Sequence, residues 1–154
     1  MSVLFDTNIF IRAAQPGHAL QPLAVKAGDI LKARGDEVCV VPQVLYEFWS
    51  VATRPAGENG LGLTTVEARI EVSRIKRLFL VHADTPAILP LWEELVAAHD
   101  VKSKNTHDAR LVAAMKVHGV SDVLTFNPAD FARYSNIAVL APQEVVEATE
   151  SPRA

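Results

Sequence analysis

The sequence predicts an α/β domain with a mostly parallel central sheet, and three observations support this. Short apolar runs alternate with longer amphipathic segments, a pattern typical of strands that alternate with helices. The run Val3-Leu4-Phe5 is continuously apolar, like a strand buried on both faces of a sheet. The chain has 154 residues, of which 49% are hydrophobic, so it can bury a sizeable core as one domain.

Helix and strand signals assign the remaining elements in order. The predicted strands cover residues 3–5, 37–41, 79–82, 120–125 and 137–140. The predicted helices cover residues 7–15, 20–34, 42–51, 64–78, 84–99 and 106–118, with a short one after Pro142, and a glycine-rich loop covers 54–62. Pro42 suits a first helical turn, Thr64 and Glu67 have capping-box spacing, Thr106 can cap a helix, and Gly119 can end it.

The composition limits the possible classes of protein. No repeat or break in composition marks a second domain, so we expect one domain over residues 1–148 and a frayed tail over 149–154. The formal charge of -3 argues against a broad nucleic-acid-binding surface, although it leaves room for a metal-dependent nuclease. The one cysteine, Cys39, lies in an apolar run and is expected to be a buried thiol. Without a signal-like or membrane-spanning apolar segment, we expect a cytoplasmic protein with no membrane contact.

Four acidic residues are candidates for a functional site. Asp6 follows the first strand, where open α/β sheets bind ligands, although it would also suit the cap of the next helix. Glu47 lies at the margin of an apolar helical arc, where an ordinary surface role is equally open. Asp108 lies within the apolar face of its helix, away from Arg110. A carboxylate that points inward must be hydrogen-bonded, paired or bound to a cation. The alternative is that Asp108 only caps the first turn of the helix.

The fourth candidate lies in the segment 125–131, directly after a strand. Asp130 offers a carboxylate there and Asn127 an amide, although both residues are also ordinary turn formers. The carboxyl ends of parallel strands meet at one edge of a sheet, so all four acids are expected to converge.

Carboxylates held this close together favour a cation, because like charges raise each other's pKa. A set of oxygen ligands without cysteine or clustered histidine suits Mg²⁺ or Mn²⁺. Such an ion holds substrate phosphates and lowers the pKa of bound water, which predicts phosphodiester hydrolysis. A phosphoacceptor signalling domain is a rival, but it would need adjacent acids after the first strand and an acceptor aspartate ending a middle strand. Here the strand at 37–41 ends in Val41 and is followed by Pro42, so it offers no acceptor aspartate.

The segments FDTNIFI, QVLYEFWSVATRP, NGLGL, HDARLVAAMKVHGV and LTFNPADF, in this order, resemble a PIN domain, in particular a VapC-type toxin ribonuclease. The resemblance covers nearly the whole chain. It implies a three-layer α/β/α fold and an Mg²⁺-dependent endoribonuclease in which Mn²⁺ can substitute. It also implies a homodimer inhibited by a small antitoxin protein. A housekeeping RNA-processing nuclease and a non-catalytic PIN binding module fit the same pattern.

The resemblance also suggests a role for each candidate. Asp6, Glu47 and Asp108 match the family's three central acids, with Asp6 and Asp108 expected to hold the metal and Glu47 to orient water or act as a base. Many members have an acid where this chain has Asn127, so either Asn127 or Asp130 completes the site, and one or two metal ions remain open. The resemblance assigns supporting roles to Thr7, Asn8 and Thr125. Candidate contacts to the RNA backbone, which equally suit solubilising charges, are Arg12, Arg54, Lys102 and Lys104.

Overall fold

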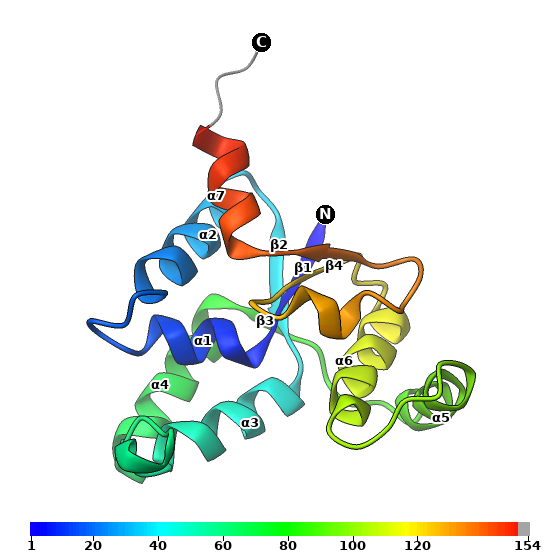
Figure 1. The fold of residues 1–154 in the computed structure, drawn as a ribbon, viewed down its shortest axis with the longest axis horizontal. Helices are drawn as coiled ribbons and strands as arrows, with labels where there is room; N and C mark the ends of the chain where they lie inside the picture. Colours follow the sequence, from blue (N-terminus) through cyan, green and yellow to red (C-terminus); the bar gives the residue numbers. More distant parts are fainter. Residues whose placement is uncertain (151–154) are drawn as a thin grey trace.

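One parallel sheet organises residues 1–150, the part of the chain that the computed structural model describes (Figure 1). Within these residues five strands pair in the order β3-β2-β1-β4-β5, and every pair is parallel. The strands are β1 (Ser2–Phe5), β2 (Glu37–Val40), β3 (Leu80–Val81), β4 (Asp122–Leu124) and β5 (Ala138–Leu140). The predicted α/β class is therefore confirmed, and the sheet is parallel throughout.

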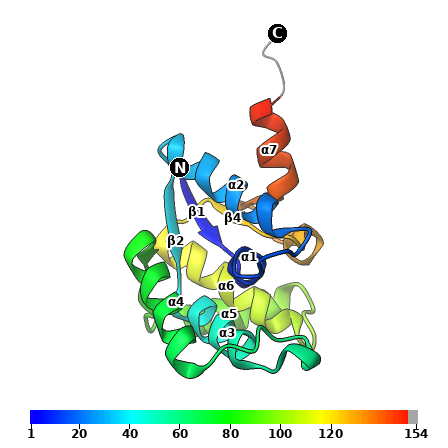
Figure 2. The ribbon, with the colours of Figure 1, turned by 90° about the vertical axis from the view of Figure 1, so that its left-hand side faces the viewer.

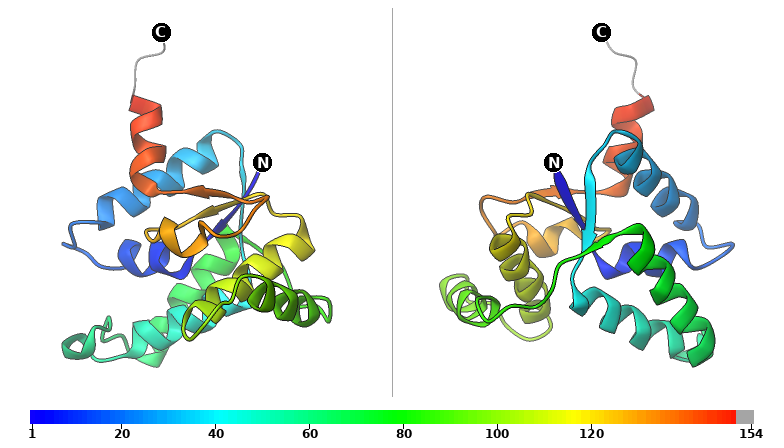
Figure 3. Two further views of the ribbon diagram at one scale, coloured as in Figure 1. Left: turned by 45° about the vertical axis from the view of Figure 1, so that its right-hand side comes forward. Right: turned by 180° about the vertical axis from the view of Figure 1, so that it is seen from behind.

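Helices connect the strands and cover both faces of the sheet (Figures 2 and 3). They are α1 (Thr7–Ala13), α2 (Gln21–Ala33), α3 (Pro42–Thr53), α4 (Thr65–Leu78), α5 (Ile88–Ala98), α6 (Asn105–His118) and α7 (Pro142–Glu150). Two short 3-10 helices, η1 (Ala56–Glu58) and η2 (Pro128–Phe131), lie in the connections. Helix α5 packs against α6, and α2 packs against α7 (Figures 1 and 3).

The strand order creates a switch point between β1 and β4. The chain runs outward from β1 through β2 to β3 and then returns to the other side of β1 as β4. Phe5 pairs with Leu124, and the Asp6 amide donates to the Leu124 carbonyl at 3.0 Å. Figure 2 shows β1 running directly into α1. Parallel α/β sheets bind ligands at such a point, so the loops after β1 and β4 are where a site is expected.

The central strand is apolar because it is covered on both sides. Val3 and Leu4 are fully buried, and the Phe5 ring contacts Phe79 edge-on at 4.9 Å between ring centroids. Phe10 meets Phe79 in the same way at 5.0 Å. Cys39 is buried as expected, with its thiol donating weakly to the Val3 carbonyl at 3.5 Å.

The local helix signals were partly right. Both halves of the capping box at Thr64 and Glu67 are present, at 3.1 and 3.0 Å. The prediction that Thr106 caps its helix is wrong, because α6 begins one residue earlier and Lys104 is its N-cap. The Thr106 hydroxyl donates to the Ser103 carbonyl at 2.8 Å, so it closes the preceding turn instead.

Helix α7 reaches Glu150, so residues 149 and 150 of the expected frayed tail over 149–154 are helical, and its residues 151–154 lie outside the described residues. None of the helices within residues 1–150 is both long and apolar enough to span a membrane.

Candidate active site

Asp6 is buried at the switch point and is bonded through both of its carboxylate oxygens. The Thr7 amide donates to Oδ1 at 2.7 Å, and the Thr125 hydroxyl donates to Oδ2 at 2.8 Å. Asp6 is thus the N-cap of α1, yet its pKa is raised above the ordinary value. Burial is the largest cause, the bonds from Thr125 and Thr7 oppose it, and the charges of Glu47 and Asp130 add to it. Asp6 therefore caps α1 and also lies among other acids.

Thr125 and Asn8 tie the two loops of the switch point together. The Thr125 hydroxyl accepts from Asn8 Nδ2 at 3.2 Å and from the Asn127 amide at 3.0 Å. Asn8 Nδ2 also lies 3.3 Å from Asp6 Oδ2, and Asn8 Oδ1 accepts from the Phe126 amide at 3.2 Å. These bonds fix the direction of the Asp6 carboxylate, as expected for supporting residues.

Glu47 is half-buried on α3 and is also held from two sides. The Thr7 hydroxyl donates to Oε2 at 3.0 Å, and Gln43 Nε2 donates to Oε1 at 2.6 Å. Sequence reasoning placed Glu47 at the margin of the apolar arc but missed Gln43. A signal was available, because Gln43 precedes Glu47 by four residues and so lies on the same side of the helix.

Asp108 is half-buried in the first turn of α6 and stands without a partner. Within residues 1–150 no hydrogen bond or ion pair engages its carboxylate, so the alternative role as a helix cap is not realised. Its pKa is raised to about 7, first by burial and then by the charges of Asp6, Asp130 and Glu47, while Lys104 opposes the rise. A carboxylate in this environment favours a cation beside it.

Asp130 lies in η2 and is near enough to Asp6 and Asp108 to raise the pKa of both. Asn127 is exposed, and its backbone amide, bonded to Thr125, ties it to the site. We call Asp6, Glu47, Asp108 and Asp130 the acid cluster.

The predicted RNA-contacting residues lie in different surroundings. Lys104 is exposed and acts electrostatically on Asp108. Arg12 donates to Gln15 at 2.8 Å, and Lys102 pairs with Asp100 at 3.2 Å. Arg54 is exposed just after α3. The structure thus brings Lys104 towards the acid cluster and shows the other three engaged or exposed elsewhere.

The acid cluster fits a hard cation in its chemistry, since all its side-chain donors are oxygens. The orphaned, half-buried Asp108 carboxylate beside the buried Asp6 is the observation that favours such an ion. Within residues 1–150 no group of three or more His, Cys, Asp or Glu residues is arranged to hold a metal by itself. Mg²⁺ is commonly bound through one or two carboxylates with water completing the shell, which suits the pair predicted from sequence.

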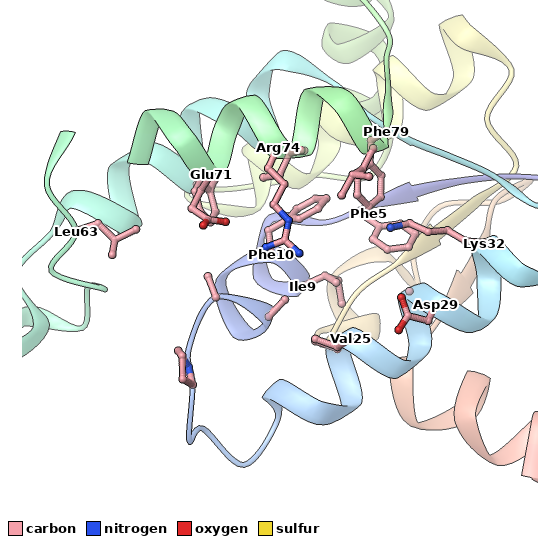
Figure 4. A pocket seen from close by; sticks show the side chains of 18 residues that line it. Phe5, Ile9, Phe10, Val25, Asp29, Lys32, Leu63, Glu71, Arg74 and Phe79 are labelled. Atoms are coloured by element: carbon pink, nitrogen blue, oxygen red, sulfur yellow. The ribbon is translucent and has the colours of Figure 1, made fainter. Parts of the chain in front are cut away.

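An apolar groove of about 370 Å³ lies between α1, α2 and α4 (Figure 4). Ile9 and Phe10 of α1 form part of its floor, so the helix that begins beside Asp6 also lines this groove. Lys32 and Arg74 lie at its edge, as do Asp29 and Glu71. Helix α1 thus lines the groove and begins at the acid cluster, although none of the four acids lines the groove.

Solved structures that are similar to this chain include toxins and toxin-antitoxin complexes. VapBC2 from Rickettsia felis, bound to promoter DNA, is 13% identical with a TM-score of 0.69, covering 92% of this chain and 98% of that one. The sarcin-ricin loop cleaving toxin VapC20 from Mycobacterium tuberculosis is 20% identical with a TM-score of 0.64, covering 88% and 98%. A toxin-antitoxin complex from Klebsiella pneumoniae is 22% identical with a TM-score of 0.61, covering 91% and 97%.

These structures share the fold of this chain. A comparison with curated protein sequences gives no match. The PIN domain family matches residues 3–137, a range that includes the entire acid cluster and ends just before β5. The chain belongs to the PIN domain family.

Proposed function

We propose that this protein is an Mg²⁺-dependent endoribonuclease, the toxin of a cytoplasmic toxin-antitoxin pair. The observation that carries the proposal is the acid cluster: four carboxylates from different elements lie near the point where β1 and β4 diverge, and burial together with the neighbouring charges raises the pKa of Asp6 and Asp108. PIN domains are generally nucleases. Neighbours that share the fold include a toxin described as cleaving the sarcin-ricin loop and several toxin-antitoxin complexes, which supports RNA as the substrate.

Each residue of the site has a proposed task. Asp6 and Asp108 would hold the cation, whose charge would neutralise the phosphodiester and lower the pKa of water. Glu47, fixed by Thr7 and Gln43, orients the attacking water or accepts its proton. Asp130, with Asn127, completes the site, and Thr125 keeps Asp6 in place. Lys104, Lys102 and Arg12 are the proposed contacts to the RNA backbone.

The test is cleavage of RNA by purified protein. We expect single-stranded or loop RNA to be cut with Mg²⁺ or Mn²⁺ and left intact with excess chelator. Asp6→Asn and Asp108→Asn should each abolish cleavage, while Glu144→Gln, a charge change on the exposed side of α7, should not. Cleavage in excess chelator would refute metal dependence. Failure to cut any of several structured RNAs would favour a non-catalytic binding module.

We propose further that a small antitoxin protein inhibits the enzyme. An inhibitory segment would lie across the acid cluster and place an Arg or Lys where the cation would bind. The apolar groove between α1, α2 and α4 shares α1 with that site, and we propose that the same partner buries an apolar helix face there. Leu78 borders the groove and is 51% exposed, which makes it a convenient probe.

Co-purification with the product of an adjacent gene tests this partner. Leu78→Lys should weaken the complex and leave RNA cleavage unchanged. Val66→Lys is the matched control, since Val66 is 69% exposed on the same helix and does not line the groove. Recovery of the chain alone, together with normal growth on its expression, would count against a toxin.

The family resemblance also leads us to propose a homodimer. Light scattering during gel filtration should give about twice the chain mass of 16.7 kDa. A mass that stays at that of one chain across a concentration series would reject the dimer.

A further inference from the structure

Gln43 is a buried residue in the first turn of α3, 6% exposed, whose side-chain amide is fully hydrogen-bonded. Its Nε2 group donates to Glu47 Oε1 at 2.6 Å and to the His107 carbonyl at 2.9 Å. Its Oε1 atom accepts from Arg110 Nη1 at 2.9 Å. One amide thus links the catalytic candidate on α3 to the first turn of α6, which carries Asp108.

The neighbours of Gln43 permit only one orientation of this amide. The Glu47 carboxylate and the His107 carbonyl can only accept, whereas the Arg110 guanidinium can only donate. Rotating the amide by half a turn would place its oxygen against two acceptors and its NH₂ group against a donor. Arg110 therefore acts together with the His107 carbonyl to set which way the amide points, and the amide in turn holds Glu47.

Arg110 is itself anchored by an aspartate that is not part of the acid cluster. Its Nη2 atom lies 3.4 Å from Asp84 Oδ2, and its side chain is 37% exposed. Within residues 1–150 it makes no hydrogen bond or ion pair with a carboxylate of the acid cluster, and Lys104 is the cation that acts on Asp108. The hydrogen-bonded route from Arg110 to Glu47 therefore runs through Gln43.

We propose that Arg110 and Gln43 are positioning residues that hold Glu47 in its working orientation. The inference rests on the proposed nuclease function and adds two residues to it. The sequence suggested neither, since Arg110 was placed on the far side of its helix from Asp108. In this arrangement the pair acts on the reaction step, because it orients the group that handles water, and has little effect on RNA binding.

Direct RNA contact is the competing role for Arg110. Arg110 borders a second hollow of about 360 Å³, lined also by Asp84, Trp92 and Leu89, which a nucleotide could enter. A residue that binds RNA there would change KM and the salt dependence of binding. A positioning residue would change kcat.

The kinetic test compares Arg110→Met, which keeps the apolar stem, with Arg110→Lys, which keeps a donor cation. We expect Arg110→Met and Gln43→Leu each to lower kcat about 10-fold or more with KM nearly unchanged, as supporting residues commonly do. Arg110→Lys should recover much of the loss. Lys116→Met is the matched control, because Lys116 lies on the same helix and donates to the Ser135 carbonyl, away from the acid cluster.

The decisive comparison is made in a Glu47→Gln background. If Arg110 acts through Glu47, then Arg110→Met should cost little further activity once Glu47 is altered. An equal loss in both backgrounds would show general structural damage and overturn the proposal. A rise in KM with unchanged kcat would overturn it in favour of direct RNA binding.

A second readout needs no activity. The side-chain NH₂ signals of Gln43 can be assigned by their loss in Gln43→Leu, and both protons should exchange slowly with water in the parent protein because both are donated. In Arg110→Met this protection should fall. Unchanged exchange in that variant would refute the positioning role even if the parent cleaves RNA. A parent that cleaves no RNA would refute the proposed function, while the exchange result still decides whether Arg110 orients Gln43.

Discussion

Asp108 is a half-buried carboxylate without a partner in residues 1–150, and its pKa is about 7 against an ordinary 3.8. Below about pH 4 it is protonated in both the folded and the unfolded chain. Between pH 4 and 7 only the folded chain keeps the proton, so this group's contribution to stability falls as the pH rises. Above pH 7 the folded protein carries the full cost of an ionised Asp108, which comes first from burial and then from repulsion by the other acids.

The metal-free Asp108→Asn variant should therefore gain stability relative to the parent as the pH rises. We expect a larger difference in unfolding free energy at pH 8 than at pH 5, measured by urea denaturation in chelator. Glu144→Gln, remote from the acid cluster, should show no such trend. A difference between Asp108→Asn and the parent that is independent of pH would contradict the raised pKa of Asp108.

Thr125 is a fully buried hydroxyl that donates to Asp6 and accepts from Asn8 and Asn127. Thr125→Val keeps the shape and removes these bonds, so it should lower the unfolding free energy by about 1–3 kcal/mol. Cleavage should fall about 10-fold, because Asp6 loses its orientation. Thr125→Ser keeps the hydroxyl and should lose little of either. Urea denaturation and cleavage rates measure both effects, and parental cleavage by Thr125→Val would reject the supporting role.

The acidic candidates were easier to identify from the sequence than the residues that position their side chains. Asp6 and Asp108 are marked by local sequence, one by the end of an apolar strand and the other by its place on an apolar helix face. The bond between Gln43 and Arg110 joins residues 67 positions apart, and no local pattern pairs them. Such bonds depend on how α3 and α6 pack, which is decided by the whole sheet.

Helix α4 begins with a capping box whose two bonds are both present. Thr64→Ala should lower the unfolding free energy by about 1 kcal/mol, because the backbone amide of Glu67 loses its acceptor. RNA cleavage should not change, since the box is remote from the acid cluster. Thr65→Ala is the control on the neighbouring exposed threonine. Equal denaturation midpoints for Thr64→Ala and the parent would contradict the box's contribution.

Element types were predicted well, and boundaries less well, for a physical reason. Strand β4 covers only Asp122–Leu124 of the predicted strand 120–125, although the Thr125 amide still donates to the Leu140 carbonyl at 3.0 Å just past its end. Helix α6 begins at Asn105, with Lys104 rather than the predicted Thr106 as its N-cap. Ser103 adopts a positive φ of 56°, and the turn it makes takes up the Thr106 hydroxyl. A backbone turn of this kind leaves no clear mark in the sequence.

The order of the strands is what assembles the site, and it could not be predicted from the pattern of elements. Alternating strands and helices indicate a parallel sheet, but they do not say that β4 lies beside β1. That neighbour relation brings Thr125 against Asp6 and places Asp130 near Asp108. The expectation that all four acids lie close together depended on this order of the strands.

The central claim is that Asp6 and Asp108 repel each other in the metal-free protein and share a cation. It is tested most directly by four melting curves, for the parent and Asp108→Asn, each with and without Mg²⁺. The metal-free variant should melt at or above the parent's temperature, although most inward substitutions destabilise. Mg²⁺ should raise the parent's melting temperature by binding the folded state, and the variant should lose most of that rise. A metal-free variant that melts well below the parent, with equal responses to Mg²⁺, would contradict the claim.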